Sequence, residues 1–236
     1  MVVKSMFRLM WLHFKYLHTR NNVILELIGF TILILSFLIS SNIFVNYEIR
    51  WVNQKEILIS YQTLVINLSK IFIPLVSCYL FGSGFLKIND DYKLIIIKKR
   101  SERIKYFISK QIVIASIVLM FCLLCNSFYL IFGVAAIPNF SKEGIINNTW
   151  LNLYLISVFY GLLSTFVVLI TKSSFGYIMV VIIYFVIQIL VEAVSLKINI
   201  LPYLINNHLS INIILLISEI IVLIWSNILY YYYMDM

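Results

Sequence analysis

Six apolar segments of 21 to 24 residues follow one another along this 236-residue chain, and they limit its possible folds more than any other feature. A helix of about 20 apolar residues crosses the hydrocarbon core of a bilayer, because each residue adds about 1.5 Å. Backbone inside lipid must satisfy its own hydrogen bonds, so such segments are helices. We predict an all-α polytopic membrane protein whose six spans are residues 23–45, 64–86, 111–134, 150–170, 174–194 and 210–231.

The composition supports this fold class. Hydrophobic residues make up 62% of the chain and charged residues only 12%, far from the balance of a soluble globular protein. The connections between the predicted spans are too short to hold a separate soluble domain of ordinary size. We therefore expect residues 1–236 to form a single transmembrane domain.

The 18 Lys and Arg residues are unevenly distributed over the connections. Thirteen fall on the side of the two termini and four on the opposite side, with Lys70 inside a predicted span. Lys and Arg are retained on the cytoplasmic side of a membrane, so both termini are expected in the cytoplasm of a multi-pass protein of the cell membrane. The same asymmetry argues against nucleic acid as the partner of the net charge of +8. Heavy use of Ile, Asn, Lys and Tyr is typical of AT-rich bacterial genomes.

Residues 1–22 have the pattern of an amphipathic helix. Lys4, Arg8 and Lys15 lie within about 40° of one another at 100° per residue. The apolar residues away from this basic stripe are Met6, Met10, Phe14 and Leu17. We expect this helix to lie in the membrane interface, with its apolar side at the acyl boundary.

The connection 87–110 holds eight Lys and Arg in 24 residues, yet its centre is apolar from Leu94 to Ile97. A loop that only fixed topology would not need four large hydrophobic residues in a row. Two interpretations are equally consistent with this pattern. It is either a short helix that docks into a groove on a cytoplasmic partner, or an interfacial helix that lies on lipid head groups.

Four charged residues fall inside predicted spans, where an ionisable group is costly and indicates function. Glu26 and Lys70 are close to span ends, so we expect them to extend toward the interface. Glu219 lies deepest, about nine residues into its span. Glu192 follows Gln188 by one helical turn near the outer end of its span. Glu219, Glu192 and Gln188 are the candidates for a translocation path; the alternative for Glu219 is a structural hydrogen bond to a neighbouring helix.

Small residues mark two close approaches between helices. Ser157, Gly161 and Thr165 recur at a spacing of four, which lets helix backbones come together in lipid. This stripe serves packing within the chain or a dimer interface. Gly82-Ser83-Gly84 is too short to bind phosphate and is explained by a kink or close packing.

Motifs of catalysis and nucleotide binding are missing from the sequence. There is no P-loop, no zinc-protease H-E-x-x-H and no G-x-S-x-G. His13, His18 and His208 are scattered, and we expect the first two to be solvated. Cys122 and Cys125 have redox-motif spacing without the strand–helix context that this motif needs. We expect no enzyme activity, no catalytic residue, no metal and no cofactor in this chain.

The order of these parts resembles the permease subunit of type-2 ATP-binding-cassette exporters. The layout is shared over the whole chain, and the residue pattern over about twenty positions: Asp90-Asp91, the segment Tyr92–Lys99, Arg100 with Arg103, and Lys110 opening span three. The resemblance implies that residues 1–22 form an elbow helix and that a coupling helix contacts a separate ATPase. Its implied contact residues are Asp90, Asp91, Tyr92, Leu94, Ile95, Ile96, Ile97, Arg100 and Arg103.

Small permeases of this kind resemble exporters of antimicrobial or toxin-like peptides, including lantibiotic self-immunity proteins. The resemblance implies a partner ATPase that binds ATP and Mg, a second permease copy or a sibling permease, a peptide substrate and membrane lipids. That family commonly has re-entrant helices between spans five and six, for which residues 195–209, with Pro202, are too short. The alternatives are a secondary transporter and a non-transporting membrane immunity protein that binds a toxin.

Overall fold

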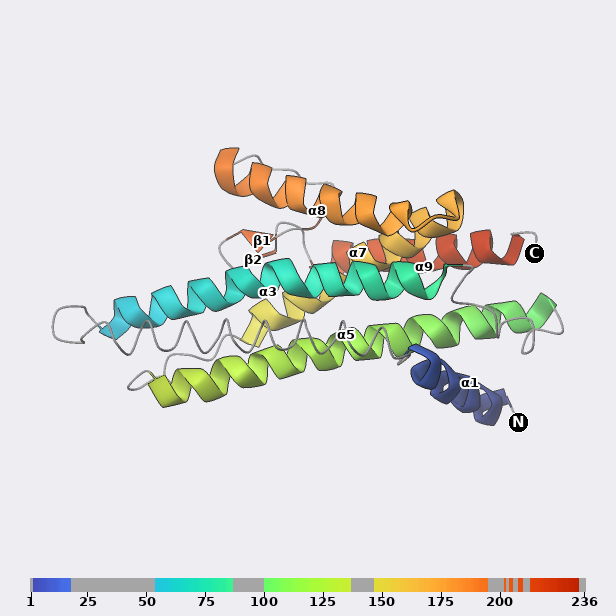
Figure 1. Ribbon diagram of the computed structural model, residues 1–236, viewed down its shortest axis with the longest axis horizontal. Helices are drawn as coiled ribbons and strands as arrows, with labels where there is room; N and C mark the ends of the chain where they lie inside the picture. Colours follow the sequence, from blue (N-terminus) through green and yellow to red (C-terminus); the bar gives the residue numbers. More distant parts are fainter. Residues whose placement is uncertain are drawn as a thin grey trace.

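The computed structural model describes residues 2–17, 54–86, 100–136, 147–194, 202, 204–205, 208–209 and 213–233. These residues form six helices and one antiparallel pair of two-residue strands (Figure 1). The helices are α1 (Val2–Leu17), α3 (Gln54–Gly84), α5 (Arg100–Ala136), α7 (Asn147–Thr171), α8 (Phe175–Val194) and α9 (Ile213–Tyr233). The strands are β1 (Leu204–Ile205) and β2 (His208–Leu209).

Four of the described helices are long and apolar enough to cross a membrane. The crossing segments are Thr63–Gly84, Glu102–Ile131, Thr149–Thr171 and Ile213–Tyr233. Helix α8 adds a shorter apolar stretch, Phe175–Leu190. The prediction of long apolar helices is confirmed for four of the six predicted spans, whereas the predicted first span, 23–45, lies outside the described residues.

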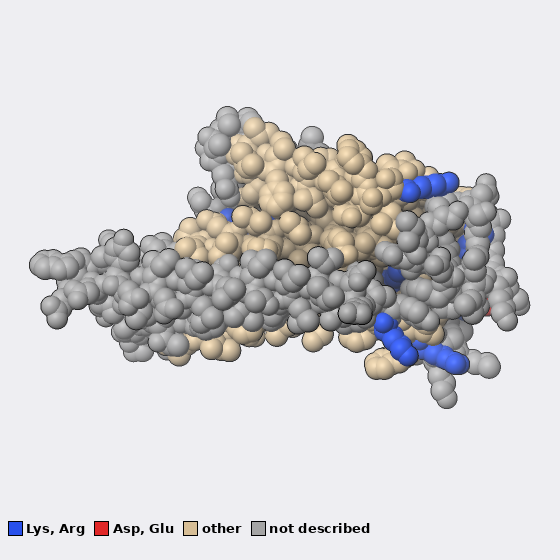
Figure 2. Space-filling view, in the orientation of Figure 1, with Lys and Arg blue, Asp and Glu red and all other residues tan. Residues whose placement is uncertain are grey.

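The long helices run side by side in alternating directions. Helices α3, α7 and α9 finish at the end of the bundle that carries α1, and α5 and α8 begin there (Figure 1). We call this the α1 end, and the opposite one the far end. On the face shown in Figure 2, most of the visible Lys and Arg atoms lie at the α1 end, and uncharged side chains cover the described flank of the bundle.

The connection between α7 and α8 explains how these helices reverse direction so sharply. Lys172 adopts a left-handed backbone with φ of 53°, and its N–H donates to the carbonyl of Val168 at 2.8 Å. Ser173 then caps α8, because its Oγ accepts the N–H of Phe175 at 3.2 Å. Helices α7 and α8 therefore form a tight hairpin at Lys172-Ser173.

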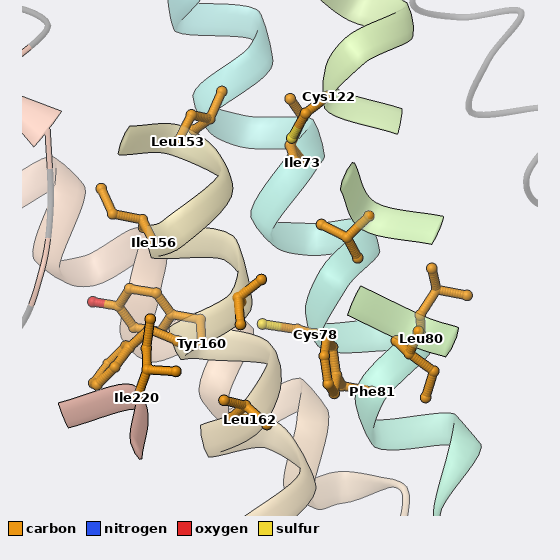
Figure 3. Packing of buried hydrophobic residues seen from close by; sticks show 14 of the residues in the cluster. Ile73, Cys78, Leu80, Phe81, Cys122, Leu153, Ile156, Tyr160, Leu162 and Ile220 are labelled. Atoms are coloured by element: carbon orange, nitrogen blue, oxygen red, sulfur yellow. The ribbon is translucent and has the colours of Figure 1, made fainter. Parts of the chain in front are cut away.

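The centre of the bundle is the packing of α3 on α7, which we call the α3–α7 seam. Ser77 Oγ donates to the Ser157 carbonyl at 2.6 Å, and Ser164 Oγ donates to the Cys78 carbonyl at 2.9 Å. Figure 3 shows Cys78 extending from α3 toward α7, close to Tyr160. Small side chains thus bring the backbones together, and hydroxyl groups bond across the contact.

Two helices extend well beyond their predicted spans. Helix α3 starts ten residues before the predicted Leu64, and α5 starts eleven residues before the predicted Gln111. Their 31 and 37 residues span about 46 and 55 Å, against about 30 Å of hydrocarbon. Hydropathy marks where a helix leaves lipid, and α3 and α5 continue past that point.

The N-terminal extension of α3 meets the second half of α5 at the far end in an aromatic cluster. Tyr61 is fully buried and stacks on Tyr129, with ring centroids 5.5 Å apart. Its hydroxyl also donates to the Tyr129 carbonyl at 3.0 Å. Trp150, near the start of α7, packs beside Tyr129 at 6.1 Å. Three helices are therefore joined at this end by aromatic contacts.

Candidate functional site

The residues predicted to contact an ATPase are only partly described by the structure. Asp90, Asp91, Tyr92 and the segment Leu94–Ile97 lie outside the described residues. Arg100 is the first residue of α5 and Arg103 lies in its first turn. Residues 87–99 therefore connect the end of α3 to the start of α5 at the α1 end.

A buried lysine lies against Phe85, which precedes this connection, and Tyr106. Lys110 is only 1% exposed, and its Nζ lies 5.0 Å from the ring centroid of Phe85 and 5.4 Å from that of Tyr106. It also donates to the Tyr106 hydroxyl at 3.4 Å. A cation held over aromatic rings away from water gains about 2 kcal/mol, which partly offsets the cost of burying the charge.

The rings around Lys110 join three helices, and we call this group the Lys110 cluster: Phe85, Tyr106, Phe107, Lys110 and Tyr231. Phe107 of α5 packs 4.8 Å from Phe85, which follows α3, and 4.7 Å from Tyr231 of α9. Phe85 and Tyr231 contact one another at 6.4 Å. The two flanks of residues 87–99 and the last turns of α9 are thus packed together.

Helix α1 is fixed to the same cluster by a histidine. His13 is fully buried, its ring meets Tyr106 edge-on at 4.7 Å, and its Nε2 lies 3.0 Å from Ser109 Oγ. Ser109 donates its one hydroxyl proton to the Tyr106 carbonyl at 2.8 Å, so His13 Nε2 carries the proton and donates to Ser109.

The expectation that His13 is solvated is therefore wrong. The side of α1 away from the basic stripe packs on α5, and Met10 contacts the core there. The expectation that this side faces the acyl boundary is also wrong for Met10. His18 lies outside the described residues.

A second group of polar side chains lies at membrane depth, on α3 and α8. Pro74 lies inside α3 and has no N–H, so it cannot bond the Lys70 carbonyl four residues earlier. The Tyr184 hydroxyl of α8 takes that place and donates to the Lys70 carbonyl at 2.7 Å. Lys70 itself is 6% exposed, and its Nζ donates to Asn67 Oδ1 at 3.4 Å.

The expectation that Lys70 extends to the interface is wrong. Lys70 lies seven residues from the start of the crossing segment Thr63–Gly84, yet its side chain is only 6% exposed. Its side chain is held inside the bundle, which places a second ionisable group at membrane depth besides Glu219.

Tyr160 connects this region to the candidate path residues. Its ring lies 4.9 Å from that of Tyr184, and the Glu219 carboxylate is close enough to interact with it electrostatically. Figure 3 shows Tyr160 extending from α7 toward Ile220 of α9. Its hydroxyl donates to the Pro202 carbonyl at 3.1 Å.

The contact with Pro202 places this one residue of the segment between α8 and α9. Tyr160 lies thirteen residues, or about 20 Å, along α7 from its far end. The Pro202 carbonyl is within reach of that tyrosine's side chain, so the buried Pro202 lies inside the bundle at this level. Gln188 is buried one turn beyond Tyr184 on α8, and Glu192 lies one turn farther still.

Helix α9 meets its neighbours through polar atoms that have no hydrogen-bond partner in the described part of the chain. These are Gln111 Nε2 on α5, and Glu219 Oε2 and Asn227 Oδ1 on α9. The Asn227 Nδ2 does donate to the Leu162 carbonyl at 3.1 Å. We call the contacts of α9 with α5 and α7 the α9 interface.

Gln111 and Asn227 lie at the same level of this interface. Helices α5 and α9 are antiparallel, and Phe107 packs on Tyr231. One turn after Phe107 is Gln111, and one turn before Tyr231 is Asn227. Both side chains are buried, at 6% and 0% exposed, so each helix carries a buried amide at this level.

The predicted small-residue stripe lies in the α3–α7 seam. Ser157 and Thr165 are fully buried within the chain, and Thr165 Oγ1 donates to the Phe81 carbonyl at 3.3 Å. A Cβ at Gly161 would collide with the Phe81 ring and lie 2.6 Å from Ser77 Oγ. Gly82 makes a similarly close approach to Tyr177 of α8.

The described residues contain no group of three or more His, Cys, Asp or Glu arranged to hold a metal ion. The three cysteines are buried free thiols. No protein-family model, curated protein or solved structure matches the chain.

Proposed function

We propose that this chain is the membrane-spanning permease subunit of an ATP-driven exporter that moves a peptide out of the membrane or cell. Two copies, or one copy and a sibling permease, complete the path. Each chain has six spans, an elbow helix α1 and a coupling helix within residues 87–99. The observation that carries this proposal is the Lys110 cluster, which packs both flanks of the basic connection against the end of α9.

The cluster gives a physical route from an ATPase to the membrane helices. A separate ATPase, which binds ATP and Mg, contacts residues 90–103. A push on this segment displaces Phe85 and Phe107, and their rings contact Tyr231 of α9 directly. Because interiors are close-packed, a shift of one ring cannot be absorbed without moving its neighbours.

The contacts of α9 make it the helix most able to move. In the α3–α7 seam the hydroxyl groups bond to carbonyls across the contact, so sliding breaks hydrogen bonds. At the α9 interface several buried polar atoms have no hydrogen-bond partner among the described residues. A shift of α9 can therefore form new hydrogen bonds as well as break existing ones. Glu219 on α9 gives the path a negative group suited to a cationic peptide, and Gln188 and Glu192 on α8 are the further candidates for its lining.

The test of this function is whether a partner ATPase depends on the apolar centre of the connection. Ile96→Asp puts a charge where a buried anchor is expected, and loss of such an anchor costs about 2 kcal/mol or more. The variant should insert normally but lose the ATPase on co-purification. The matched control is Ser173→Asp, which adds the same charge to an exposed connection at the α1 end. Equal recovery of the ATPase with both variants would show that residues 87–99 only rest on lipid.

A secondary transporter is the second candidate, and Lys70 is the observation that favours it. Lys70 and Glu219 are ionisable groups of opposite sign at membrane depth, as ion-coupled transporters require. Export that persists without ATP but stops when an ionophore removes the ion gradient would support this candidate. Export that follows ATP in the presence of the ionophore would support the first.

A further inference from the structure

Burial divides α1 into faces of different character. His13 and the side around it are packed on α5. On the opposite side, Phe7 is 71% exposed and Trp11 is 70% exposed. Arg8 and Lys15 are exposed beside these rings. At 100° per residue the exposed arc runs about 120° from Phe14 to Arg8, apolar in its first half and basic in its second.

The docking of α1 on α5 fixes this arc relative to the bundle. The His13–Ser109 hydrogen bond and the edge-on contact with Tyr106 prevent α1 from turning about its axis. The helix lies at the α1 end, beside the ends of helices long enough to cross a membrane (Figure 1). The exposed arc therefore belongs at the level of lipid head groups.

We propose that the exposed arc of α1 is a binding surface for anionic phospholipids of the surrounding bilayer. Phe7 and Trp11 insert below the head groups, while Arg8 and Lys15 bind phosphate oxygens of negatively charged lipids. Large rings next to cations complement a boundary between hydrocarbon and phosphate. The inference goes beyond the proposed transport function, since it requires neither ATP, nor an ATPase, nor cargo.

The experiment places the full chain in vesicles and uses Trp11 as the reporter. Trp51→Phe, Trp150→Phe and Trp225→Phe leave Trp11 as the single tryptophan. Vesicles contain phosphatidylcholine and phosphatidylglycerol at three to one, with bromine on the acyl chains of one lipid or the other at equal total bromine. Brominated phosphatidylglycerol should quench Trp11 more strongly, with local enrichment on the order of tenfold for two cations near the surface.

Two comparisons identify the cause of that preference. Arg8→Gln with Lys15→Gln should abolish it while leaving quenching by brominated phosphatidylcholine unchanged. High salt should reduce it, because the charges are screened. The control is Lys172→Gln, which removes an exposed cation from the α7–α8 connection and should keep the preference.

Three results would overturn the proposal. Equal quenching by the two brominated lipids would show that the head group is not selected. A preference that survives in the Arg8 and Lys15 variant would show that these cations do not select it. Absence of quenching by either lipid would show that a protein surface covers this face of α1.

Discussion

The α3–α7 seam and the α9 interface are both lined by polar side chains, but their hydrogen bonds are completed to different degrees. In the seam, Ser77, Ser164 and Thr165 donate to backbone carbonyls of the opposite helix. At the α9 interface, Gln111 and Asn227 each keep an amide atom without a partner in the part of the chain that the structure describes.

The chemistry of the side chains explains this difference. A hydroxyl needs only one acceptor, and a helix offers a second lone pair on every carbonyl. An amide carries a donor and an acceptor at opposite sides, so both must be matched. Each buried polar group without a hydrogen-bond partner costs about 1–3 kcal/mol. We do not expect a contact that never rearranges to keep such groups. We accordingly propose that the seam is the fixed frame and that the helices rearrange at the α9 interface.

Gly161→Leu should have the largest effect, because it breaks the frame itself. The added side chain meets the Phe81 ring and Ser77 Oγ, and overpacking of this kind costs about 1–3 kcal/mol or more. We expect a clear loss of folded protein in detergent thermal-stability measurements. Ser116→Leu, at an exposed position on α5, is the control and should leave stability unchanged.

Glu219→Gln tests the α9 side of the comparison. This change keeps the size and hydrogen-bonding groups of the side chain but removes its charge. We expect normal assembly and ATPase binding, with export or resistance reduced severalfold at matched expression, because the carboxylate attracts a cationic cargo. If the variant exports fully, Glu219 only hydrogen-bonds a neighbouring helix and does not belong to the path.

The two variants with the smallest expected effects compare the α3–α7 seam with the α9 interface directly. Ser77→Ala removes a completed hydrogen bond and should lower stability by about 0.6 kcal/mol, the average for such bonds between membrane helices. Gln111→Leu removes an unmet donor, so stability should stay the same or rise. Export should fall only in the second variant. A thermal shift of equal size and sign in both variants would remove the distinction between the contacts.

The sequence predicts the helical membrane class well, because hydropathy over twenty residues reports directly on burial in lipid. It predicts helix ends poorly, since a helix leaving the bilayer keeps its hydrogen bonds. Lys70 is close to the start of the crossing segment Thr63–Gly84 in the structure as in the sequence, and only the packing of the bundle shows that its side chain is buried. The Lys70–Pro74 spacing was a usable signal, because proline frees the carbonyl four residues earlier.

The candidate site depended on contacts between distant segments. The position of His13, opposite the basic stripe, was readable from the helical period, but its partner Ser109 is 96 residues away. Lys110 and Tyr106 are one turn apart, a spacing that allows a local pair, whereas the packing of Phe85 and Tyr231 around them is visible only in the tertiary structure. The helical period predicts which residues share one face of a helix, and only the fold shows which faces contact one another.

Cross-linking across both contacts tests the central claim, that an ATPase moves α9 against a fixed frame, most directly. The three native cysteines are replaced by alanine, and Gln111→Cys with Asn227→Cys is compared with Ser77→Cys with Ser157→Cys. Each pair is oxidised in vesicles with the co-purified ATPase, without nucleotide and with ATP trapped by vanadate. We predict that the disulfide yield of the 111–227 pair changes severalfold between the two states while that of the 77–157 pair stays constant. Yields that do not respond to nucleotide, or that change equally in both pairs, would contradict it.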